Sequence, residues 1–73
     1  MANVSTLQEI KNIKVGDSMD WKPCFTTYDI YRKDENTFEI NCTNGTWQTA
    51  IVTIAEIEQI FEGTLKLINL NWN

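Results

Sequence analysis

The stretch FEINCTNGTWQTAI, residues 38–51, decides the fold, because an Asn-Gly pair stands between two runs of alternating polar and apolar residues. Asn44-Gly45 suits a two-residue type I′ turn, whose central positions both need a positive φ. The pairs that this turn sets up are Cys42 with Trp47, Ile40 with Thr49, and Phe38 with Ile51. These pairs place the apolar side chains on one face of a hairpin. We therefore interpret the thiol, hydroxyls and amides of this stretch as parts of a turn and not as a reactive site.

The preceding turn predicts a second hairpin that shares this apolar face. Asp34-Glu35-Asn36 suits a three-residue loop with Asn36 in the left-handed region. Such a loop pairs Ile30 with Ile40 and Tyr28 with Cys42. Together the two turns predict a three-stranded antiparallel meander over roughly residues 26–32, 37–43 and 46–53.

Two amphipathic segments flank the meander, and each predicts a short helix that ends at a glycine. The first carries capping hydroxyls at Ser5 and Thr6, with Thr6-x-x-Glu9 as a capping box, and we expect it to end at Gly16. The second begins with the capping box Thr53-x-x-Glu56 and ends at Gly63. The apolar stripes of the two helices are Leu7, Ile10 and Ile13, and then Ile54, Ile57, Ile60 and Phe61.

Two further strands are expected beside the meander. SMDWKP, residues 18–23, alternates and is closed by Pro23, as is typical of an edge strand. TLKLINLNW, residues 64–72, follows the second helix and is apolar on both of its faces. Either a bulge or intramolecular cover hides the second face, or Ile68, Leu70 and Trp72 form an interface.

The pattern as a whole predicts the α+β class and a single small domain over residues 1–73. We expect an antiparallel β-sheet, built from the three-stranded meander plus flanking strands, with two short helices on one face. The order of the elements is α-β-β-β-β-α-β.

Composition disfavours several classes of function. The net charge is −4, from ten acidic and six basic residues, and this balance disfavours direct binding to nucleic acid. We find no apolar run long enough for a transmembrane helix, and the start MANVSTLQEI lacks the basic and apolar regions of a secretory signal. We therefore expect a cytoplasmic protein with no membrane partner.

Catalytic and metal-binding sets are also missing from the sequence. Cys24 and Cys42 are the two thiols, and the chain has no histidine to ionise a thiol or to complete a zinc site. The carboxylates read as solvated faces or turns, which do not raise a pKa as general acid–base catalysis requires. We expect no enzyme activity, no metal and no cofactor, and we expect both thiols to be buried and structural.

The second helix carries the leading functional hypothesis, a non-enzymatic protein-binding module. Its polar face holds Glu56, Glu58 and Glu62 with no basic residue of the same helix to balance them. Such an acidic face predicts binding to a basic protein partner, helped by exposed aromatic residues at Trp21 and Tyr31. The alternative is a self-associating structural protein, a homodimer that pairs through Ile68, Leu70 and Trp72.

In general style the chain resembles the small accessory proteins of phages and mobile elements, being short, acidic and without catalytic equipment. Some proteins of that kind, including anti-CRISPR proteins, bind and inhibit host proteins. The resemblance implies an inhibitory role for the protein-binding module, and no single motif carries it.

Overall fold

The computed structural model of the protein describes residues 2–22, 26–42 and 48–73. These residues form two helices, four strands and a short 3₁₀ turn, which are α1 (Ala2–Lys11), β1 (Ser18–Trp21), β2 (Tyr28–Arg32), β3 (Thr37–Cys42), β4 (Thr49–Thr53), α2 (Ile54–Glu62) and η1 (Leu67–Asn69). The α+β class, the antiparallel sheet and the two short helices are confirmed. The last element differs from the expected strand.

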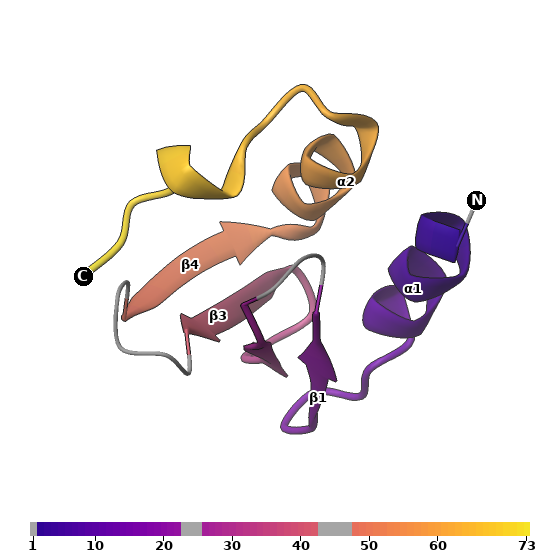
Figure 1. Cartoon of the computed structure of the whole chain (residues 1–73). Coiled ribbons are helices and arrows are strands. Elements are labelled where there is room, and N and C mark those ends of the chain that lie inside the picture. Colours follow the sequence, from indigo (N-terminus) through magenta and orange to yellow (C-terminus); the bar gives the residue numbers. More distant parts are fainter. Residues whose placement is uncertain (1, 23–25, 43–47) are drawn as a thin grey trace.

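The sheet is a meander whose strands lie in sequence order, β1-β2-β3-β4, each antiparallel to the next. α2 and the C-terminal segment lie over the sheet, and α1 stands beside α2 (Figure 1). Residues of both helices, Ile10 and Ile57, join one buried cluster with Ile30, Phe38 and Ile40 of the strands. Burial of this cluster is the main favourable contribution to folding. Because both helices pack on this side, no helix among the described residues covers the opposite face of the sheet.

The β2–β3 hairpin has the predicted register, with Tyr28 opposite Cys42 and Ile30 opposite Ile40. Its loop, however, needs no left-handed residue, because no described residue other than glycine has a positive φ, so the expectation for Asn36 is wrong. The Asp34 carboxylate accepts the backbone N–H of Asn36 at 3.0 Å instead. This hydrogen bond from Asn36 is the main cause that holds the pKa of Asp34 below its ordinary value.

The β3–β4 register differs from the prediction by one residue. Phe38 lies opposite Val52, and Ile40 lies opposite Ala50, so Ala50 and Val52 are buried while Ile51 is 44% exposed. A shift of one residue moves every side chain of a strand to the other face. β4 has apolar residues on both faces, so alternation did not decide its register. The Asn44-Gly45 turn itself and Trp47 lie outside the described residues.

The start of α1 also differs from the prediction. The helix begins at Ala2, so Ser5 and Thr6 lie within it and Thr6-x-x-Glu9 is not a capping box. Its apolar stripe is confirmed, because Ile10 and Ile13 are buried. A capping pattern involves only neighbouring residues, and here the helix extends through the Thr6-x-x-Glu9 pattern instead of starting at it.

Gly16 belongs to a turn and a bulge, and it does not end α1. The N–H of Asp17 donates to the carbonyl of Lys14 at 2.9 Å, and Gly16 has a φ of +93° at the third position of this turn. Gly16 N–H donates to the Arg32 carbonyl, and Arg32 N–H donates to the Asp17 carbonyl, both at 2.9 Å. Two residues therefore oppose one, as in a bulge that starts with a left-handed glycine. This bulge leads the chain from α1 into β1.

α2 has the predicted boundaries. The Thr53 hydroxyl accepts the N–H of Glu56 at 3.2 Å, and the Glu56 carboxylate accepts the N–H of Thr53 at 2.8 Å, which completes the capping box. Gly63 follows with a φ of +90° and ends the helix.

The C-terminal segment is not the predicted strand. It forms the 3₁₀ turn Leu67–Asn69, which places Leu67 and Leu70 on one side of the backbone. Leu67, Leu70 and Trp72 pack against the core, while Ile68 is 62% exposed. The indole Nε1–H of Trp72 donates to the Leu67 carbonyl at 2.8 Å, and Asn73 N–H donates to the Thr49 carbonyl at 2.9 Å. Packing within the same chain thus covers most of the apolar residues that would be exposed if this segment were a strand.

The guanidinium of Arg32 ties the end of α1 to the sheet. Its Nη1 donates to the carbonyls of Lys11 at 3.1 Å and Ile13 at 2.7 Å, where the helix ends. Its Nε and Nη2 donate to the carbonyls of Asp34 at 3.2 Å and Glu35 at 2.6 Å in the β2–β3 loop. The same group lies 5.1 Å from the centre of the Phe38 ring. One side chain therefore connects the first helix, a loop and the core.

We predict that Arg32→Ala lowers the free energy of unfolding by about 2–3 kcal/mol, because several carbonyls lose a charged donor at once. Arg32→Lys should recover only a minor part, since an ammonium cannot reproduce the planar fork. Urea unfolding followed by circular dichroism measures both values. Lys33→Ala, which removes an exposed charge from the next residue, is the control and should stay within about 0.5 kcal/mol of the original protein. An equal effect of the Arg32 and Lys33 variants would contradict this role.

Gly16→Ala should lower the free energy of unfolding by about 1–2 kcal/mol, because a Cβ is strained at this positive φ even though the space around it is open. Gly16→Asn should lower it less, since asparagine tolerates the left-handed region better. Thermal unfolding of the two variants gives the comparison. If Asn destabilises the protein as much as Ala, the strain is not the cause.

Candidate functional site

Two of the three acidic residues of α2 have partners within the same chain. Glu56 belongs to the capping box, where its carboxylate accepts the Thr53 N–H at 2.8 Å. The Glu58 carboxylate lies 2.8 Å from the ammonium of Lys11 on α1. The prediction counted only bases on the same helix, and the tertiary structure supplies Lys11 from the neighbouring one. Glu62 is exposed, and the Glu58 side chain remains 40% exposed beside Lys11, so the binding role of this acidic face stays a prediction.

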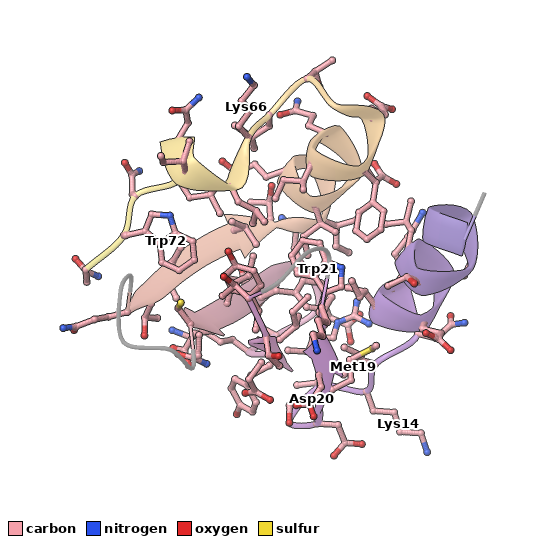
Figure 2. The ribbon with its side chains drawn as sticks, in the orientation of Figure 1. Lys14, Met19, Asp20, Trp21, Lys66 and Trp72 are labelled. Carbon is pink, nitrogen blue, oxygen red and sulfur yellow. The ribbon has the colours of Figure 1, made fainter. Side chains whose placement is uncertain are left out.

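The predicted interface residues fall into separate parts of the molecule. Trp21 is only 6% exposed and stacks on Phe61 with a centroid distance of 5.5 Å, so the expectation that it is exposed is wrong. Figure 2 shows the Trp21 ring pointing toward α2, and the Trp72 ring lying over the sheet. Leu70 and Trp72 pack against the core, and Ile68 alone of the C-terminal trio is exposed. Tyr31 is half-buried and lies on the other side of the sheet.

The uncovered side of the sheet carries two rows of side chains that run across all four strands. The strand register defines the rows, which are Ser18-Tyr31-Glu39-Ile51 and Asp20-Asp29-Asn41-Thr49. We call these eight residues the open face. None of them is buried, whereas their neighbours along each strand include the core residues Trp21, Tyr28, Ile30, Ile40 and Ala50. Strand alternation therefore separates the core from this second surface.

The open face is acidic. It holds the carboxylates of Asp20, Asp29 and Glu39, and no lysine or arginine belongs to either row. Asp20 and Asp29 are directly opposite each other on β1 and β2. Like charges in that position destabilise a sheet. The fold therefore keeps a concentration of negative charge here that its own stability does not favour.

Hydrogen bonds order one end of the open face. The Thr49 hydroxyl donates to the Asn41 side-chain oxygen at 2.8 Å. The Asn41 amide in turn reaches the Glu39 carboxylate at 3.4 Å. These contacts cross β4 and β3 and hold a carboxylate beside Tyr31, which is the cross-strand partner of Glu39. The surface is thus partly preorganised for polar contacts.

The described residues of the open face offer negative charge, and they form no metal-chelating group. In residues 2–22, 26–42 and 48–73, no group of three or more histidine, cysteine, aspartate or glutamate side chains could hold a metal ion. Cys42 is half-buried against the core, while Cys24 lies outside the described part of the chain. No helix within these same ranges has the length and apolar character needed to cross a membrane.

Sequence reasoning missed the open face, although one signal for it was present. Asp20 and Asp29 each stand between two inward-pointing residues of a strand, as in Met19-Asp20-Trp21 and Tyr28-Asp29-Ile30. Alternation alone places each aspartate outward. Asp20 and Asp29 face each other because of the β1–β2 register. No short-turn pattern stands between these two strands in the sequence, so the sequence did not predict that register.

Comparison with known proteins adds no family: the chain matches no protein-family model, no curated protein and no solved structure.

We predict that Asp29→Asn raises the free energy of unfolding by about 0.2–0.5 kcal/mol, because it removes the repulsion from Asp20 across the strands. Asp20→Asn should have a similar effect, and the double variant should gain less than the sum, since either change alone removes the repulsion. Urea unfolding at low salt measures the set. Glu9→Gln, an exposed change on α1, serves as the control with the same change in charge. Strictly additive gains would show that Asp20 and Asp29 do not interact.

Proposed function

We propose that this protein is a non-enzymatic protein-binding module that uses the open face to bind a basic surface of a partner protein. The observation that carries the proposal is the pair of side-chain rows across the sheet, with Asp20 and Asp29 in direct opposition. A bound partner that supplies lysine or arginine side chains would remove this repulsion. Binding would then relieve a cost that the free protein carries.

The composition of the open face supports protein recognition. Tyr31 lies near its middle, with Ser18 on one side and Glu39 on the other. Tyrosine contributes a large contact area together with a polar group, and it is enriched at interfaces. Ile51, which is 44% exposed, adds an apolar edge to the same row. Because the residues stand on a sheet, their backbone is already ordered, so the conformational cost of docking is mainly that of the side chains.

Charge complementarity determines the class of partner. Three carboxylates, with no lysine or arginine in either row, attract a cationic protein surface and repel the phosphates of nucleic acid. The role that we propose is inhibitory, as the general style of the chain implies: by covering a basic surface, the module would block whatever that surface binds. Glu62 of α2 is not part of this surface in our proposal.

The alternative of a homodimer through the C-terminal segment has less support. Leu70 and Trp72 pack against the core of their own chain, and Trp72 also stacks on Tyr28 with a centroid distance of 6.3 Å. A dimer contact would have only Ile68 of the three predicted residues exposed. Sedimentation equilibrium at high protein concentration tests for it directly.

The test is affinity capture from a lysate of the source organism or its host by three immobilised proteins. These are the original chain, the sheet variant Asp20→Asn/Asp29→Asn/Glu39→Gln, and the control variant Glu9→Gln/Glu35→Gln/Glu62→Gln, whose three substitutions are all at exposed positions outside the open face. We expect a near-stoichiometric protein, identified by mass spectrometry, that the control retains and the sheet variant loses. High salt should release it, because exposed charge pairs are screened.

Equal capture by both variants would refute the proposed surface, and loss with the control alone would return the site to the exposed acids such as Glu62. Once a partner is purified, calorimetry with the same variants gives the change in affinity. We expect about a tenfold loss for the sheet variant, from three charge contacts of a few tenths to 1 kcal/mol each. An activity assay of the partner then decides whether binding inhibits it.

A further inference from the structure

We propose a second binding site, for a small anionic amphiphile such as an aryl or alkyl carboxylate or sulfonate, in a hollow beside the C-terminal end of α2. The hollow measures about 370 Å³ and is lined by Trp21, Ile60, Phe61, Gly63, Leu65, Lys66 and Leu67. It lies between the helix and the segment that follows it, on the covered side of the sheet and away from the open face. This site is independent of the proposed protein-binding function.

The walls of the hollow suit a flat apolar group. Trp21 and Phe61 both line the hollow, and their rings stack on each other with an interplanar angle of 23°. Leu65 and Leu67 continue the apolar lining. The volume lies in the range of small-molecule sites, which are concave and mostly apolar with few polar groups.

Leu65 is the sharpest indication that this lining serves something other than the core. Leu67, Ile60 and Phe61 all pack against the core cluster as well as lining the hollow. Leu65 is half-buried and lines the hollow, yet it does not belong to the described residues that pack against that cluster. A ligand in the hollow would cover the apolar surface that Leu65 presents, which is favourable in proportion to the area removed from water.

The charge of the residues that line the hollow favours an anionic ligand. Among the described residues, Lys66 is the only charged one that lines the hollow, and none of the acidic ones does, although the chain as a whole carries −4. The Lys66 side chain projects outward from the C-terminal segment into solvent (Figure 2). An exposed lysine has a long flexible stem, so its ammonium can meet an anionic group at the mouth while the apolar body of the ligand stays inside. Cationic ligands lack this contact.

A matched pair of fluorescent probes tests the site. The anionic probe is 1-anilinonaphthalene-8-sulfonate, and the neutral one is N-phenyl-1-naphthylamine, which has the same rings without the sulfonate. We expect the anionic probe to bind about two- to fivefold more tightly, the range that a single exposed charge contact supplies. Amide shifts in ¹H–¹⁵N spectra should concentrate in residues 60–67 and at Trp21. Strongest shifts elsewhere on the chain would overturn the assignment.

Two variants separate the charge from the apolar wall. Lys66→Gln should weaken the anionic probe to the level of the neutral one and leave the neutral probe unchanged, whereas Lys33→Gln, the same change at the distant β2–β3 loop, should leave both unchanged. Leu65→Asn should weaken both probes by about three- to tenfold without loss of fold, because Leu65 stands outside the core cluster. Circular dichroism checks the fold of each variant.

Equal affinity for the two probes, or an equal effect of the Lys66 and Lys33 changes, would overturn the anionic class of the ligand. If Leu65→Asn has no effect on either probe, the site itself is overturned.

Discussion

The hydrogen bonds of the Arg32 guanidinium are the contacts on which the arrangement of this small protein depends. They reach the carbonyls that end α1 and the carbonyls of the β2–β3 loop, and the cation lies over Phe38 in the core. The backbone of Arg32 also pairs with the Gly16–Asp17 bulge. Helix, bulge, strand and loop therefore meet at one residue. In a chain of 73 residues, with a small core, such a multiple contact positions elements that burial alone would leave less well defined.

A second constraint is that the core occupies only one side of the sheet. Both helices and the C-terminal segment contribute to one buried cluster, so alternation sends the intervening strand residues to the other side. Three of those residues are carboxylates, and two of them, Asp20 and Asp29, are directly opposed. Stability alone would favour neutral or paired residues there. An oppositely charged partner would relieve this cost on binding, and that gain is the physical basis of the function that we propose.

The accuracy of the sequence predictions followed the range of the interactions that they used. The capping box at Thr53 and Glu56, the end of α2 at Gly63 and the β2–β3 register all depend on residues a few positions apart, and all are confirmed. The C-terminal strand and the register of β4 are wrong, because each is apolar on both faces and neighbours decided which face turned inward. The ion pair between Glu58 and Lys11 was missed for a similar reason, since Lys11 comes from a distant part of the chain. The exposure predicted for Trp21 failed because Phe61, from α2, covers it.

The sequence by itself thus determined the α+β class, the order of the three strands β2, β3 and β4, the second helix with both of its ends, and the overall acidity. These follow from local periodicity, turn residues and composition, which need no knowledge of contacts between distant segments. Only the tertiary structure decided which acids remain available to a partner and which apolar residues line a hollow instead of the core. Glu58 and Glu62 stand one helical turn apart on α2, yet only Glu58 meets Lys11 of α1. Whether a side chain is available to a partner depends on the residues that the folded chain packs beside it.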